Sequence, residues 1–182
     1  MILSSELKGF ETQRFVMRPL AGDDAPDLFR HLANPDVTAF MDIDPLDTVE
    51  QAEGIVDWAE DLRQAGKGAR FSIRARADSS FAGTCGFNSL VLERGCRGEI
   101  AYDLSPAWQG KGVMAEILPA LVDLGLGRLR LQRLEAFVTP GNEPSCRLLE
   151  RHGFACEGTL RDYGFWKDRF WDQLLYARTA RP

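Results

Sequence analysis

Residues 98–118 change from the pattern of a β-strand to that of an α-helix across a short turn. In residues 98–104 apolar side chains occupy every second position, as in a strand with two different faces. Pro106 ends this pattern, and from Val113 onward the apolar residues recur at helical spacing. The turn between the two contains the sequence Gln109-Gly-Lys-Gly112. The chain must therefore adopt a fold in which a strand leads almost directly into a helix.

This glycine-containing turn has the chemistry of an anion site. The first backbone N–H groups of a helix have no partner within the helix, and the helix dipole places positive charge at the same end. Lys111 adds a mobile cation to the turn. The sequence therefore predicts that residues 109–114 bind a phosphate or pyrophosphate group.

Two common nucleotide-binding loops fit the turn poorly. A Walker-type loop requires G-x-x-x-x-G-K-[ST], but Lys111 is followed by Gly112 and no glycine lies five residues before Gly110. Residues 110–115 do match the dinucleotide pattern G-x-G-x-x-[GA], with Glu135 at a suitable distance. However, residues 105–109 separate the strand from the glycines, and too little chain follows for a doubly wound sheet. These departures argue against a dinucleotide site.

The rest of the chain predicts alternating strands and helices. Strands are expected at residues 15–20, 70–73, 81–92, 98–104, 134–139, 157–166 and 170–178, the last pair forming a hairpin. Helices are expected at residues 23–34, 48–64, 113–126 and 143–152, with Pro35 ending the first of them. We expect one domain over residues 1–182 of the α/β (α+β) class, with a mixed, mostly antiparallel twisted sheet of about seven strands and about four helices.

Charge and cysteine content narrow the class of function. A net charge of -5 and a pI near 5.1 argue against nonspecific nucleic-acid binding and suit a cationic substrate such as an amine. No metal site is expected, because there are only two histidines and the four cysteines form no C-x-x-C pair. Without a signal peptide or an apolar run of spanning length, we expect a cytoplasmic protein with reduced thiols and no membrane partner.

The turn also resembles the signature of a known family. Gln109-x-x-Gly112 followed by a helix is similar to the (Q/R)-x-x-G-x-(G/A) signature of the GNAT acyltransferases, which binds the pyrophosphate of coenzyme A. Met114 departs from the signature, which has Gly or Ala at that position. The similarity covers about residues 10–178 and closely resembles the Rim-type branch, the ribosomal-protein N-terminal alanine and serine acetyltransferases. It is carried by residues 11–20, 98–102, 108–114, 133–145, 148–154 and 157–158, and by Asp172 in the last strand.

The resemblance implies a GNAT fold and acetyl transfer from acetyl-CoA to a primary amine by direct attack in a ternary complex. A protein N-terminal α-amine is the first choice of acceptor. A small-molecule amine (antibiotic, polyamine or peptide-like) and a catalytically silent acyl-CoA-binding module remain alternatives. The protein is expected to be a monomer or a homodimer.

The resemblance also implies roles for individual residues. Glu99 is the candidate general base, acting directly or through water, and the Ser145 hydroxyl is expected to lie near the thioester sulfur and to donate to the thiolate. Cofactor binding is expected from Leu104, Gln109, Gly110, Lys111, Gly112, Val113, Met114, Asn142 and Arg147.

Structural alternatives exist for these roles. Glu99 could pair with Arg97, Ser145 could cap its helix, and Arg147 could simply face water. Many GNAT relatives use a tyrosine to protonate the thiolate, and the equivalent position here is predicted to be Leu149. The loop of residues 40–42 is a possible wall of the acceptor site.

Overall fold

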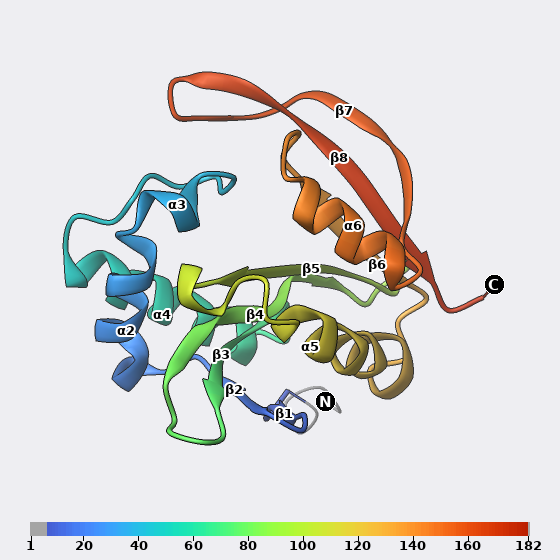
Figure 1. Cartoon of the computed structure of the whole chain (residues 1–182). Coiled ribbons are helices and arrows are strands. Elements are labelled where there is room, and N and C mark those ends of the chain that lie inside the picture. Colours follow the sequence, from blue (N-terminus) through green and yellow to red (C-terminus); the bar gives the residue numbers. More distant parts are fainter. Residues whose placement is uncertain (1–6, 182) are drawn as a thin grey trace.

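The computed structural model describes residues 7–181, which form a single sheet with helices on both faces (Figure 1). The sheet has eight strands in the order β1-β2-β3-β4-β5-β6-β8-β7, and β5 and β6 are its parallel neighbours. The strands are β1 (Phe10–Glu11), β2 (Phe15–Pro19), β3 (Ala69–Ala75), β4 (Phe81–Val91), β5 (Arg97–Leu104), β6 (Arg133–Val138), β7 (Ala155–Trp166) and β8 (Arg169–Thr179). The expected mixed, mostly antiparallel sheet is confirmed. The additional strand is β1, whose short length gives no period-2 pattern.

The described residues also contain five α-helices. They are α2 (Ala25–Leu32), α3 (Pro35–Thr38), α4 (Val49–Gln64), α5 (Val113–Val122) and α6 (Glu143–Arg151). The first helix was expected to run to residue 34 and to end at Pro35; α2 ends earlier, at Leu32, and Pro35 begins α3. A proline lacks the N–H that would be unpaired at a first helical position, and the Asn34 side chain accepts the Asp36 N–H. No helix within residues 7–181 is long and apolar enough to cross a membrane.

The core consists of two apolar clusters. The larger one joins the sheet to α5 and α6, with Phe71, Phe87, Ile117 and Leu149 fully enclosed. The smaller one joins α2 and α4, around Leu28 and other apolar residues of these helices. Figure 1 shows α5 and α6 apart from α2 and α4, with the strands between them. Each helix pair therefore covers one side of the sheet.

A proline inside α5 leaves a carbonyl without its usual donor, close to a histidine at the end of α6. Pro119 has no N–H for the carbonyl of Ala115, four residues earlier. His152 Nε2 lies 3.3 Å from that carbonyl oxygen and Nδ1 lies 2.8 Å from the Leu148 carbonyl. The α-helical form of α5 ends at Val122, earlier than the expected residue 126, and continues as a π-helical turn. His152 therefore ties the end of α6 to the helix that follows the glycine turn.

Candidate active site

The parallel strands β5 and β6 pair at their first residues and then separate. Within residues 7–181 the two strands pair over residues 97–99 and 133–135 and no further. β5 nevertheless continues to Leu104 and β6 to Val138. Successive residues of a strand point to opposite faces, so Glu99 and Tyr102 lie on opposite sides of β5. The gap between the strands thus has the glycine turn and α6 on one face and Glu99 on the other.

The turn before α5 presents a series of free backbone donors. Gly110 and Gly112 are both left-handed, with φ of 70°. In the described chain, the N–H groups from Gly110 to Ala115 make no backbone hydrogen bond, and Glu116 is the first to do so, to the Gly112 carbonyl at 3.2 Å. A side chain added at Gly110 would meet open space. The arrangement predicted from the sequence, a run of N–H groups without backbone partners at a helix start, is therefore present.

Side chains around the turn leave these donors accessible. Gln109 Nε2 donates to the Leu104 carbonyl at 3.0 Å, which joins the turn to the end of β5. Lys111 Nζ lies 5.8 Å from the centre of the Trp108 ring. Met114 is buried in the larger core cluster, so its side chain points away from the donors. The departure from the GNAT signature at Met114 is thus accommodated by the core.

Ser145 lies at the separated end of β5, opposite Tyr102. The Tyr102 hydroxyl is 2.8 Å from Ser145 Oγ. The cap of α6 is Asn142, whose side-chain oxygen accepts the Ser145 N–H at 3.3 Å. The alternative that Ser145 itself caps the helix is therefore wrong, because its hydroxyl bonds to Tyr102.

Sequence reasoning missed Tyr102. Leu149 was predicted to occupy the position of the relatives' tyrosine. It has no hydroxyl, and it is fully buried in the core. Burial raises the pKa of Tyr102 to about 12, although the hydrogen bond with Ser145 opposes the shift. The phenol therefore retains its proton at neutral pH. The available signal was the alternation of β5, which places Tyr102 on the face away from Glu99.

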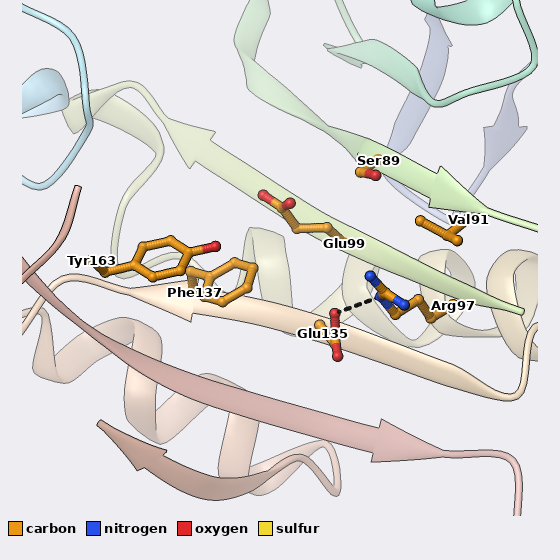
Figure 2. Close-up of a pocket in the computed structure, with 7 residues that line it drawn as sticks. All are labelled: Ser89, Val91, Arg97, Glu99, Glu135, Phe137 and Tyr163. Atoms are coloured by element: carbon orange, nitrogen blue, oxygen red, sulfur yellow. Dashed lines mark ion pairs between the residues drawn. The ribbon is translucent and has the colours of Figure 1, made fainter. Parts of the chain in front are cut away.

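Glu99 lies in a cavity of about 130 Å³ on the other face of the strands (Figure 2). The cavity is lined by Ser89, Val91, Arg97, Glu99, Glu135, Phe137 and Tyr163. In Figure 2 the Glu99 carboxylate extends toward the aromatic pair, whereas Glu135 turns toward Arg97. Arg97 Nε lies 3.4 Å from Glu135, so the alternative in which Arg97 pairs with Glu99 is wrong.

The Glu99 carboxylate is half-buried, and Asn88 Nδ2 donates to it at 3.4 Å. Burial raises its pKa, the Asn88 hydrogen bond lowers it, and the negative charges of Asp42 and Glu135 raise it, with an upward net shift. Asp42 belongs to the loop that the sequence suggested as an acceptor-site wall. Glu99 is thus a carboxylate with raised proton affinity beside a small cavity, as a general base requires.

Aromatic side chains form another wall of this cavity. Phe137 and Tyr163 stack with their ring centres 5.1 Å apart and an interplanar angle of 18°. Tyr163 lies in an irregular part of β7 where the pairing shifts between Leu160 and Gly164. Within it, the Asp162 N–H donates to Asp172 Oδ1 at 2.9 Å. Asp172, singled out from the sequence, therefore holds the bulge that carries Tyr163.

A buried polar network lies beneath the same face of the sheet. Asp103 accepts hydrogen bonds from Thr84 and Arg70 and lies 2.6 Å from His31 Nε2. Burial alone would raise the pKa of Asp103, but its hydrogen bond and charge interaction with His31, together with Arg70 and Thr84, lower it. Arg70 also donates to Asn88 Oδ1 at 3.2 Å, which turns the Asn88 amide nitrogen toward Glu99. The network thereby sets the orientation of the group that contacts Glu99.

Arg147 is the least constrained of the expected site residues. Its side chain is exposed on α6 and lies 3.9 Å from Glu143. Neither its contact with a cofactor nor that of Asn142 is tested by this geometry, and both stay predictions.

Comparison with known proteins identifies the family of this chain. Residues 14–155 match the family model described as an acetyltransferase (GNAT) domain. An uncharacterized N-acetyltransferase, p20, from Bacillus licheniformis is 39% identical over 170 residues, covering 93% of this chain and 95% of that protein. The alanine N-acetyltransferase of ribosomal protein uS5 from Escherichia coli (strain K12) is 29% identical over 120 residues, covering 66% of this chain and 62% of that protein.

Among solved structures, RimL, a ribosomal α-N-protein acetyltransferase in complex with coenzyme A, superimposes with a TM-score of 0.82. The match covers 92% of this chain and 95% of that one at 22% identity. At this identity the likeness shows a shared fold.

Proposed function

The chain belongs to the GNAT acetyltransferase family, and from that premise we propose that it transfers the acetyl group of acetyl-CoA to a protein N-terminal α-amine. It is an N-acetyltransferase by family; the acceptor and the roles of single residues are the proposal. The observation that carries it is the position of Glu99 in a cavity on the face of β5 opposite the glycine turn. Cofactor and acceptor can then approach the gap between β5 and β6 from opposite sides.

The residues present fit coenzyme A. The N–H groups from Gly110 to Ala115 are free of backbone partners, and the space beside Gly110 is open. These donors would hold the pyrophosphate, with Gln109 and Lys111 beside it. Beyond residue 99 one edge of β5 is unpaired with β6, and backbone groups on this edge would pair with an extended chain. The Leu104 carbonyl at its end already accepts a hydrogen bond from Gln109. When bound, acetyl-CoA supplies the acetyl group and a thiolate leaving group.

Acetyl transfer requires two proton transfers, one from the acceptor amine and one to the leaving thiolate, and residues of this chain would carry out both. An amine reacts only as the free base, so the ionised Glu99 carboxylate would accept its proton, directly or through water. On the other face, Tyr102 keeps a proton at its hydroxyl and bonds to Ser145 Oγ. This pair would deliver a proton toward the leaving sulfur, with Ser145 as the donor and Tyr102 behind it.

The cavity beside Glu99 favours a small cationic group. Its volume of about 130 Å³ corresponds to roughly four water molecules in liquid. It combines a carboxylate with an aromatic wall, which suits an ammonium group. The α-amine of a chain that begins with a small residue meets both conditions, and the names of the uS5-alanine acetyltransferase and RimL point the same way. We place this reaction in the cytoplasm.

Thiol release from acetyl-CoA, with the product identified by mass, tests the proposal. The panel contains peptides starting with Ala or Ser, the same peptides blocked at the N-terminus, and small amines such as polyamines. The free peptides are expected to gain one acetyl group while the blocked peptides do not react. Acetylation confined to the small amines would show that the acceptor is a small-molecule amine and not a protein N-terminus. Cofactor binding without any thiol release would indicate a catalytically silent acyl-CoA-binding module.

A further inference from the structure

Arg14, in the turn between β1 and β2, clamps the glycine turn from outside. Its Nη1 and Nη2 atoms both donate to the Lys111 carbonyl at 3.3 Å. Its Nε donates to Glu116 Oε2 at 2.6 Å and its backbone N–H to Glu116 Oε1 at 2.8 Å. One residue from a distant part of the chain therefore holds both the middle of the turn and the first part of α5.

The contact with Lys111 fixes the direction of a peptide group. In a planar trans peptide, the C=O and the N–H of the next residue point in opposite directions. Because the Lys111 carbonyl is held toward Arg14, the N–H of Gly112 is directed away from it, toward the open side of the turn. Gly110 and Gly112 on either side are in a conformation from which glycine departs readily. Without an external contact this peptide could rotate and lose the donor.

Glu116 gives the clamp a second role. A carboxylate in the first part of α5 would repel an anion bound at the helix start. The salt bridge with Arg14 compensates this charge. Burial raises the pKa of Glu116, but hydrogen bonds from Thr12 and Arg14 and the charge of Arg14 lower it on balance. Arg14 thus makes the turn an effective anion site without itself lying among the free N–H groups.

We propose that Arg14 is a positioning residue for the coenzyme A site, which orients the Lys111–Gly112 peptide so that the turn binds the pyrophosphate. This inference rests on the proposed placement of coenzyme A at residues 109–114. It concerns affinity for the nucleotide end of the cofactor and not the acyl-transfer step.

The test measures coenzyme A binding by calorimetry and turnover with two acetyl donors. Arg14→Ala is expected to weaken coenzyme A binding about tenfold or more, since it removes several charge-assisted hydrogen bonds. KM for acetyl-CoA should rise while kcat at saturation stays near wild type. With S-acetylpantetheine, which lacks the pyrophosphate, kcat/KM should be the same in the variant and the wild type.

Arg76→Ala is the matched control. The Arg76 side chain is 47% exposed, like that of Arg14, and binds Glu11 and the Thr12 carbonyl in the same N-terminal region without touching the glycine turn. Its coenzyme A affinity should stay within about twofold of wild type. Arg14→Lys keeps the charge that compensates Glu116 but loses the planar fork that binds the Lys111 carbonyl, so it should recover only part of the affinity.

Three results would overturn the inference. These are unchanged coenzyme A affinity in Arg14→Ala, an equal loss with both acetyl donors, and full recovery in Arg14→Lys, which would indicate a simple charge effect. If the wild-type protein itself binds no coenzyme A, the proposed function fails instead, so the two failures are distinguishable.

Discussion

The Tyr102 hydroxyl of β5 lies 2.8 Å from Ser145 Oγ of α6, and this hydrogen bond crosses the place where β5 and β6 have separated. Burial raises the pKa of Tyr102 to about 12, so the phenol keeps its proton, and either hydroxyl can donate in this hydrogen bond. In the arrangement where the phenol donates, the serine proton is free to point toward the gap. A tyrosine on a strand and a serine on a helix together form the candidate acid.

Tyr102→Phe removes the hydroxyl but keeps the ring. We expect kcat to fall on the order of tenfold to a hundredfold, because Ser145 loses the donor that supports its proton transfer. Ser145→Ala should lower kcat at least as much as Tyr102→Phe does. The double variant should lower kcat no further than Ser145→Ala, since the pair acts as a unit. Steady-state kinetics with acetyl-CoA and the best acceptor supply these values. Additive losses, or a loss confined to the free energy of unfolding, would contradict a joint role.

Glu99→Gln tests the base. The wild-type kcat/KM should fall as the pH drops through the raised pKa of Glu99, because the protonated carboxyl cannot accept a proton. The variant should lose about a hundredfold at pH 8 and lack this acidic limb, so the two curves converge at low pH. Coenzyme A affinity should be unchanged. A variant that keeps the acidic limb would remove Glu99 as its origin.

The same substitution has a predictable effect on stability. The folded-state pKa of Glu99 lies above its unfolded value near 4.3, so its contribution to stability is present below that value and is lost as the pH rises through the folded pKa. Glu99→Gln should therefore be more stable than wild type at pH 7, with the difference disappearing below about pH 4. Urea unfolding across this range measures it. A variant less stable at pH 7 would show that the ionised carboxylate is stabilised in the fold.

Local features of the site were predictable from sequence. The anion turn depends on neighbouring residues alone: glycines, a lysine and a following helix within residues 109–114. The position of Glu99 on a strand followed from alternation. Contacts between distant segments were not predictable in this way, because periodicity says that β5 has two faces but not which face meets α6. Tyr102 and Ser145 are 43 residues apart, and only the tertiary fold brings them together.

Boundaries were wrong where local rules compete. The first helix was expected to run to residue 34, but α2 ends at Leu32. Asn34 is extended before Pro35, and its side chain caps the helix that Pro35 begins. A pair between Arg97 and Glu99 was the structural alternative to the base role of Glu99, but side chains on adjacent strands also compete for such an arginine. Arg97 accordingly reaches Glu135 on β6.

Asp103→Asn should destabilise the fold by about 3–5 kcal/mol, because it leaves the buried Arg70 guanidinium without its counterion. The lowered pKa of Asp103 means that its contribution to stability is present above the unfolded value near 3.9 and is lost as the pH falls through the folded pKa. The difference between wild type and variant should therefore narrow in acid. Asp23→Asn, an exposed carboxylate paired with Arg18, is the control and should change stability little. A cost for Asp103→Asn that is independent of pH would show that charge is not the cause.

Asp172→Ala should weaken acceptor binding without touching the cofactor site. It removes the acceptor of the Asp162 N–H, so the bulge that holds Tyr163 against Phe137 loses its anchor. We expect KM for the acceptor to rise several-fold, with a loss of about 1 kcal/mol in the free energy of unfolding and no change in coenzyme A affinity. Asp172→Asn keeps an acceptor oxygen and should restore KM.

Variants of Tyr163 test whether Asp172 affects acceptor binding through the stacked rings of Phe137 and Tyr163. Tyr163→Phe keeps the stacked ring and should behave like wild type, whereas Tyr163→Ala should raise the acceptor KM as much as Asp172→Ala does. Because both changes remove the same wall, the double variant should be no worse than either single one. Initial rates over a range of acceptor concentrations at saturating acetyl-CoA give these values. If Asp172→Ala raised KM further in the Tyr163→Ala background, Asp172 would act on the acceptor by a separate route, and the bulge would not be the reason for its position in β8.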